Sequence, residues 1–97
     1  MTRAPEGRPE PQLLTVYEAV NDRLKELYVG ATSRLLDAQT REFLAAPPAA
    51  AAHWQPRDVE LRAIEHSMPE PDAKAFIEHY AGSRASEGWT VHREPLA

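Results

Sequence analysis

The feature that most constrains the fold is a pair of apolar runs joined by a short, largely polar connection. Residues 13–20 and 27–32 are rich in β-branched, aromatic and other large apolar side chains, which is typical of buried strands. The connection, residues 21–25, is short enough to bring the chain straight back alongside itself. The two runs therefore predict an antiparallel β-hairpin.

Prolines and hydrophobic periodicity define the elements in the middle of the chain. A helix is predicted over residues 33–46, because Ser33 or Asp37 can cap its start and Pro47–Pro48 stops it. Residues 59–65 alternate between apolar and polar side chains, which predicts a strand. The middle of the chain thus adds one helix and a third strand.

A second helix with a clear amphipathic pattern follows. Asp72 can cap it or serve as its first-turn acid, and Gly82 is well placed to end it. Its apolar stripe has the spacing i, i+3, i+4, i+7 and i+8 and consists of Ala73, Phe76, Ile77, Tyr80 and Ala81. Residues 88–92 predict a short last strand. The order β-β-α-β-α-β predicts an α+β fold, with helices packed on a small, largely antiparallel sheet.

Length and composition limit the organisation of the chain. Its 97 residues suffice for one domain, which we place at residues 13–97 after a flexible, proline-rich leader at residues 1–12. The lack of cysteine excludes disulfides, thiolate metal sites and a cysteine nucleophile. No apolar run approaches the roughly 20 residues of a membrane span, and the N-terminus does not resemble a signal peptide. We therefore expect a cytoplasmic protein without a membrane partner, and its many alanines and arginines are typical of a GC-rich bacterial genome.

The net charge bears on the kind of partner. The chain carries 15 acidic and 11 basic residues, for a formal net charge of -4. Proteins that bind nucleic acid without specificity draw most of their affinity from neutralised phosphates and usually carry a basic surplus. The charge therefore disfavours nucleic acid as a partner. It does not exclude a local basic face, and a protein partner stays open.

Several enzyme classes lack their characteristic residues. The sequence has no glycine-rich phosphate loop and no GxSxG nucleophile motif. The four histidines are spaced evenly by 13 residues, and no pair has the close spacing of a helix-borne or finger-type zinc site. We expect His53, His66, His79 and His92 to be ordinary surface or partly buried side chains.

The hairpin carries a pattern that resembles the signature of the GIY-YIG nuclease superfamily. Thr15-Val16-Tyr17 on the first run is followed, after ten residues, by Tyr28-Val29-Gly30 on the second. Residues 71–78 resemble a later helix of that family, and residues 88–91 resemble its closing segment. The family has the same order of elements, so the resemblance extends over roughly residues 13 to 93 and implies a small GIY-YIG-like domain.

The resemblance implies a metal-dependent site for hydrolysing phosphodiester bonds in nucleic acid. Such hydrolysis needs an activated nucleophile, a divalent cation and positive charge that stabilises the transition state. By resemblance, Tyr17 and Tyr28 lie beside the nucleophilic water and Gly30 gives the backbone room. An arginine contacts the phosphate, and Glu78 holds Mg²⁺ or Mn²⁺.

Two of these assignments have alternatives. The arginine is Arg41 or, at the start of the first helix, Arg34. The metal ligand falls on Glu78 when it is counted back from the closing segment. Helix phase instead favours Ile77, about 100° away, as the residue that borders the inner face. Isoleucine cannot bind a hard cation, which needs oxygen donors, and Glu65 is then a remote substitute.

Two functions therefore stay open. One is a divergent nuclease with Tyr17, Tyr28, Arg41 and Glu78 as its working set. The other is a catalytically lapsed module without a cofactor, acting as a protein-interaction or structural domain. Thr15 and Thr90, which replace a glycine and an asparagine of the family pattern, favour the second. Its candidate contact surface is residues 47–54, unless Trp54 is a core residue that closes the sheet.

Overall fold

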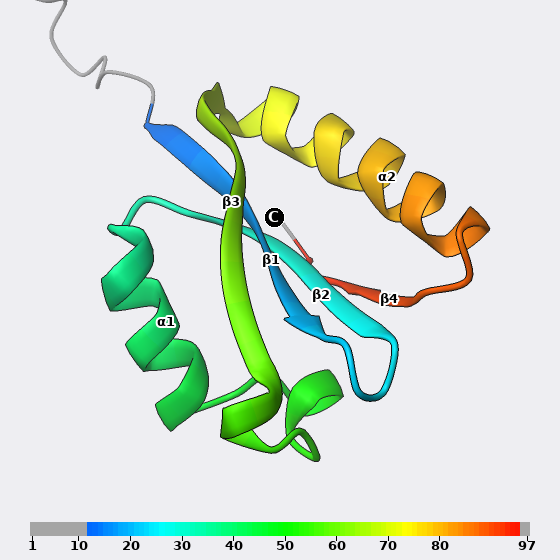
Figure 1. Cartoon of the computed structure of the whole chain (residues 1–97). Helices are drawn as coiled ribbons and strands as arrows, with labels where there is room; N and C mark the ends of the chain where they lie inside the picture. Colours follow the sequence, from blue (N-terminus) through cyan, green and yellow to red (C-terminus); the bar gives the residue numbers. More distant parts are fainter. Residues whose placement is uncertain (1–11, 96–97) are drawn as a thin grey trace, which may run out of the picture.

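The computed structural model describes residues 12–95, which form a mixed sheet between helices (Figure 1). The sheet has the strand order β3-β1-β2-β4. Strand β1 (Leu13–Asn21) pairs antiparallel with both β2 (Glu26–Thr32) and β3 (Val59–Pro69). Strand β4 (Thr90–Arg93) lies parallel to β2 at the other edge. The predicted hairpin is confirmed, and the sheet is mostly antiparallel.

Two α-helices of the described chain cover opposite faces of this sheet (Figure 1). Helix α1 (Leu36–Ala45) and the short 3₁₀ turn η1 (Ala49–Ala51) pack on one face, and α2 (Glu70–Ser86) packs on the other. A second 3₁₀ turn, η2 (Pro56–Asp58), leads into β3. The order β-β-α-β-α-β and the small α+β class are both confirmed. No helix within residues 12–95 is long and apolar enough to cross a membrane.

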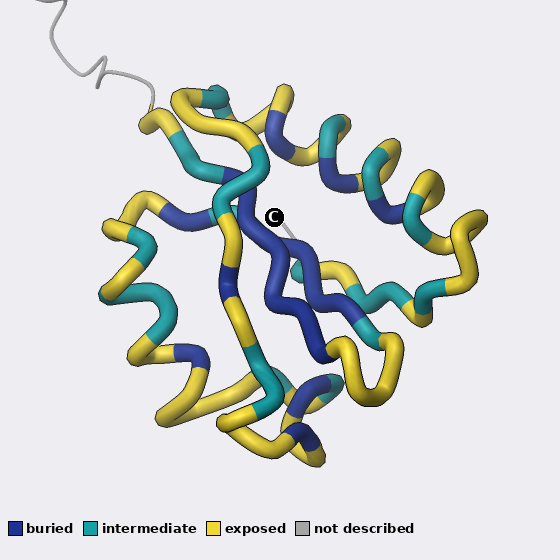
Figure 2. The backbone as a smooth tube through the Cα atoms, viewed as in Figure 1, coloured by how far each residue is buried: buried dark blue, intermediate teal, exposed yellow. Residues whose placement is uncertain are grey.

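The strand alternation produces two hydrophobic cores. On the α1 face, Tyr17 and Tyr28 pack with Phe43, Trp54 and other apolar residues. On the α2 face, the core consists of Val16, Val29, Ala73 and Ile77. Side chains alternate along a strand, so neighbouring residues of β1 and β2 belong to different cores. The central strands are therefore the most deeply buried part of the chain (Figure 2).

Helix α1 begins differently from the sequence prediction. Neither Ser33 nor Asp37 caps it, because the residue before the helix is Leu35, whose side chain makes no capping bond. The Thr32 hydroxyl instead accepts a hydrogen bond from the Arg34 backbone N–H at 3.0 Å. This local turn ends β2 and directs the chain toward the helix.

Helix α2 is longer than its apolar stripe suggests. It follows Pro69 directly, with Asp72 in its first turn. It passes through Gly82 and ends at Ser86. Gly88 adopts a φ of 97° beyond the last turn, a left-handed conformation that favours glycine after a helix. The helix therefore ends at Ser86, one turn later than predicted.

The remaining boundaries differ by a few residues. Strand β3 runs to Pro69 and not to residue 65, because bulges in its pairing with β1 let the ladder continue to Leu13. Strand β4 begins at Thr90, two residues later than predicted. The leader predicted for residues 1–12 lies, apart from Gln12, outside the described residues.

Candidate functional site

The two signature tyrosines lie on the same face of the sheet, the one that α1 covers. Tyr17 is directly opposite Gly30 in the β1–β2 ladder, and Tyr28 is opposite Ala19. Both rings belong to the α1-side core. Only 1% of the surface of Tyr17 is exposed and 7% of that of Tyr28. The two tyrosines thus lie in the same core, and both are buried.

A carboxyl group from the end of the chain reaches Tyr17. Glu94 follows β4, and its backbone N–H donates to the Val29 carbonyl oxygen at 2.8 Å. Its side chain crosses Gly30, and the Tyr17 hydroxyl donates to Glu94 Oε1 at 3.4 Å. A β-carbon on Gly30 would overlap Glu94 Oε1 and lie 3.0 Å from the Tyr17 hydroxyl oxygen. Gly30 therefore provides the space through which Glu94 reaches Tyr17.

Helix α1 supplies the other contact to Tyr17. Gln39 Nε2 donates to the Tyr17 hydroxyl oxygen at 3.4 Å, and the Thr32 hydroxyl donates to Gln39 Oε1 at 2.8 Å. The hydrogen bonds form a chain from Thr32 through Gln39 and Tyr17 to Glu94. We call this group, together with Tyr28 and Gly30, the tyrosine site.

Burial and negative charge shift the titrations of this site. Burial, the Glu94 charge and the neighbouring Tyr28 raise the pKa of Tyr17 far above its ordinary value. Burial, followed by the Glu94 charge, raises the pKa of Tyr28 to about 12. Burial also raises the pKa of Glu94, although the hydrogen bond from Tyr17 opposes this shift. Both phenols therefore stay protonated at neutral pH, and that of Tyr17 donates a hydrogen bond to Glu94.

Two open cavities meet at Glu94. One has a volume of about 280 Å³ and is lined by Lys74, Ile77, Glu78, Arg93, Glu94 and Pro95. The other measures about 390 Å³, and its lining includes Thr32, Arg34, Gln39, Glu42, Glu70 and Glu94. The first lies along α2 and the end of the chain, and the second lies beside the start of α1. The tyrosine site is thus between two openings, with Glu94 as its outer wall.

The other residues implied by the resemblance are not part of the tyrosine site. Arg41 is exposed on α1, and Arg34 is paired with Glu42. The Glu78 side chain is 62% exposed and is paired with Arg93. Ile77 is buried in the α2-side core, on the opposite face of the sheet from the tyrosines.

These positions do not fit the expected divalent cation. Among residues 12–95, no group of three or more His, Asp or Glu side chains is arranged to hold a metal ion. Glu78 is engaged with Arg93, so its carboxylate is neutralised by a cation of the chain itself. Glu65, the remote substitute, is exposed on β3. The described residues therefore offer no cage for Mg²⁺ or Mn²⁺.

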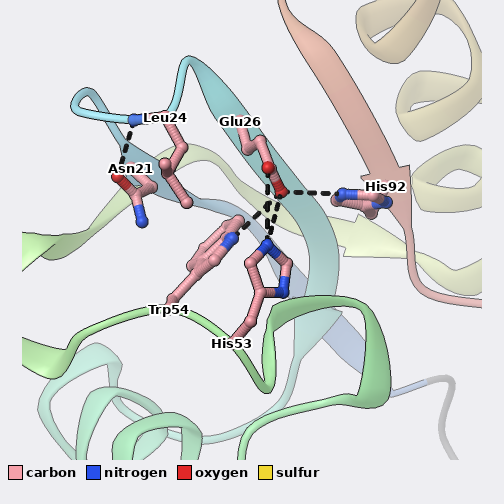
Figure 3. A network of polar contacts seen from close by, with 6 residues as sticks. All are labelled: Asn21, Leu24, Glu26, His53, Trp54 and His92. Atoms are coloured by element: carbon pink, nitrogen blue, oxygen red, sulfur yellow. Dashed lines mark hydrogen bonds and ion pairs between the residues drawn. The ribbon is translucent and has the colours of Figure 1, made fainter.

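A second polar cluster on the same face joins three segments (Figure 3). The Glu26 carboxylate accepts a hydrogen bond from Trp54 Nε1 at 3.0 Å and contacts His92 Nε2 at 3.2 Å and His53 Nε2 at 3.4 Å. Burial alone would raise the pKa of Glu26, but the bonds from Trp54 and both histidines outweigh it and lower this pKa. Trp54 is 7% exposed and packs against Phe43, which confirms that it is a core residue. The cluster ties β2 and β4 to the segment after α1.

No family model, curated protein or solved structure matches this chain. The GIY-YIG resemblance therefore depends on the residues of the hairpin and the order of the elements. Tyr17, Tyr28 and Gly30 are placed together, whereas Glu94, Gln39 and Thr32 are additions that the resemblance did not identify.

Replacing Glu94 by glutamine is expected to change the pH dependence of stability. Because the pKa of Glu94 is raised in the folded state, the folded state holds the proton of this carboxyl more tightly than the unfolded state does. The free energy of unfolding therefore falls as pH rises from the unfolded pKa through the folded one. Glu94→Gln lacks this loss and should be more stable than wild type at pH 7, with a smaller difference at pH 4.

Urea unfolding of both proteins between pH 4 and pH 8 measures this difference. Glu60→Gln removes the same charge from an exposed position on β3 and serves as the control. If the free energy of unfolding differed between Glu94→Gln and wild type by the same amount at every pH, Glu94 would not be a half-buried carboxyl.

Proposed function

We propose that this chain is a divergent GIY-YIG-like domain that has lapsed as a catalyst and serves as a structural or protein-interaction module. One observation carries the proposal. The hydroxyl of Tyr17 is enclosed by Glu94 and Gln39 of the chain itself, and Tyr17 is 1% exposed. In this arrangement a phosphodiester cannot reach the Tyr17 hydroxyl, because Glu94 and Gln39 already occupy the space around it.

The charges around the tyrosine site support the same proposal. A phosphate that approached Tyr17 would meet the Glu94 carboxylate, and like charges placed together cost several kcal/mol. Two nearby cations, Arg34 and Arg93, are each paired with a glutamate. The formal net charge of -4 adds a general repulsion of nucleic acid.

The surface available to a protein partner overlaps residues 47–54, the predicted contact surface, at Pro47, Ala51 and Ala52. Trp54 is buried and is not offered for contact. An apolar groove of about 190 Å³ remains beside it, with Leu44, Pro47 and Pro56 in its lining. This groove is compatible with a module that binds another protein or domain, since apolar concave surfaces are typical of such contacts.

The second candidate function is the metal-dependent nuclease. It is favoured by the placement of Tyr17 and Tyr28 on one face, with Gly30 opposite Tyr17. In this alternative Arg41 and Glu78 would have to move toward the tyrosines when nucleic acid and Mg²⁺ or Mn²⁺ bind.

A plasmid-nicking assay separates the two candidates. We expect no Mg²⁺- or Mn²⁺-dependent nicking by the wild-type chain, because residues 12–95 offer no metal cage and because Arg34 and Arg93 are both paired with glutamates. Tyr28→Phe and Glu78→Ala should then leave the background unchanged. Metal-dependent nicking by wild type that is lost in either variant would replace the proposed module by the nuclease. Salt-sensitive binding to the same DNA would also count against the module.

A further inference from the structure

Glu94 occupies a singular place in the molecule. Among the described residues that line the two cavities, Glu94 is the one that both share. Its carboxyl lies over Gly30 and accepts the bond from Tyr17, on the same face of the sheet as the tyrosines. A side chain in this position separates the two cavities from each other and covers the Tyr17 hydroxyl.

Few contacts with the described residues hold the Glu94 side chain in this position. Strand β4 has four residues at the edge of the sheet, and Glu94 lies beyond its end. Its backbone is held by the bond to Val29, and its side chain by one 3.4 Å bond to Tyr17. The preceding Arg93 pairs with Glu78 at an exposed site, and such pairs contribute about 0–1 kcal/mol. A short edge segment with few contacts opens locally at low cost.

We propose that Glu94 is a latch, which in its closed position separates the two cavities and covers Tyr17, and in its open position joins them into one groove. The floor of the open groove is Gly30, and the Tyr17 hydroxyl and the Gln39 amide face into it as hydrogen-bond donors. The latch goes beyond the proposed function, since it holds for a module and for a nuclease alike.

Among residues 12–95, no cationic side chain forms an ion pair with Glu94 in the closed position. Facing Glu94 are the phenols of Tyr17 on β1 and Tyr28 on β2. The cavities add Arg34, Glu42, Glu70, Lys74, Glu78 and Arg93. Arg34 and Arg93 are already paired with Glu42 and Glu78. Within the described residues, the carboxyl of the latch is thus held by hydrogen bonding and packing, and releasing it costs less than breaking a buried ion pair.

Nitration of tyrosines by tetranitromethane, located by mass spectrometry, tests the latch. In wild type we expect Tyr80, which is partly exposed on α2, to react well before the covered Tyr17. Glu94→Ala should raise the nitration rate of Tyr17 at least about tenfold, because in wild type Tyr17 reacts only in the fraction of molecules in which the latch is open. Glu94→Gln keeps the size of the side chain, so Tyr17 should stay protected from nitration in this variant.

Two comparisons make the result decisive. Glu70→Ala removes another glutamate, an exposed one, from the lining of the second cavity, and it should leave Tyr17 protected. If Glu94→Ala left Tyr17 as protected as in wild type, or accelerated Tyr80 equally, the latch would be disproved. Equal acceleration in Glu94→Gln and Glu94→Ala would assign the effect to charge and would likewise overturn it.

Discussion

Replacing Trp54 by alanine is expected to lower the free energy of unfolding by about 3–5 kcal/mol, the usual cost of truncating a buried tryptophan. The side chain is 7% exposed and packs against Phe43, with ring centroids 6.1 Å apart. It also donates to Glu26, so the variant leaves that half-buried carboxylate with weaker partners. Urea unfolding monitored by circular dichroism measures the loss.

Two neighbouring variants separate the packing of Trp54 from its hydrogen bond. Trp54→Phe keeps an aromatic ring but loses the donor to Glu26, and should cost about 1–3 kcal/mol. His53→Ala removes a side chain that is 56% exposed and should cost at most about 1 kcal/mol. A loss below about 1 kcal/mol for Trp54→Ala, under the range for buried tryptophans, would place Trp54 at the surface and restore it as a candidate contact residue.

The fold could be predicted well because its signals are local. The two apolar runs and their short connection specify the hairpin, and the apolar stripe from Ala73 to Ala81 specifies the buried face of α2. The alternation of residues along β3 also predicts that Leu61 and Ala63 share one face of the strand, and in the structure they are opposite Ala19 and Tyr17 of β1. Each of these depends on residues close together in sequence, whose period identifies the element.

The helix ends were predicted less well, because other interactions replaced the expected caps. Ser33 and Asp37 have the right chemistry for an N-cap, yet the Thr32 hydroxyl makes the turn that precedes α1. Gly82 has the right chemistry for a helix end, yet α2 continues through it until Gly88 takes the left-handed conformation. Capping propensity identifies possible ends, and the tertiary contacts of the helix decide among them.

Only part of the tyrosine site could be predicted, because some of its residues are far apart in the sequence. Tyr17, Tyr28 and Gly30 belong to one hairpin, so their mutual placement follows from its register. Glu94 reaches Tyr17 from 77 positions away, through the parallel pairing of β4 with β2. The alternation of β4 puts Glu94 on one face with His92, but nothing local shows which strand β4 joins. Gln39 was equally hidden, because an arginine was expected to provide the α1 contact.

Gly30→Ala is expected to lower the free energy of unfolding by about 1–3 kcal/mol, the usual cost of overpacking. The added β-carbon would overlap Glu94 Oε1 and lie 3.0 Å from the hydroxyl oxygen and 3.1 Å from Cζ of Tyr17. The end of Glu94 can move aside, whereas the ring of Tyr17 is fixed in the core. The cost should therefore come mainly from Tyr17 and partly from Glu94.

A double-mutant cycle with Glu94→Ala measures the two shares. In the Glu94→Ala background the same Gly30→Ala change should cost less, because one of its two obstacles has been removed. Gly82→Ala is the matched control: no atom lies within 4 Å of its added β-carbon, and alanine in a helix interior should stabilise by about 0.5–1 kcal/mol. If Gly30→Ala were as harmless as Gly82→Ala, Glu94 would not cross Gly30. If Gly30→Ala were costly by the same amount in both backgrounds, the crowding would come from Tyr17 alone. Glu94 would then not lie over Gly30, as the latch requires.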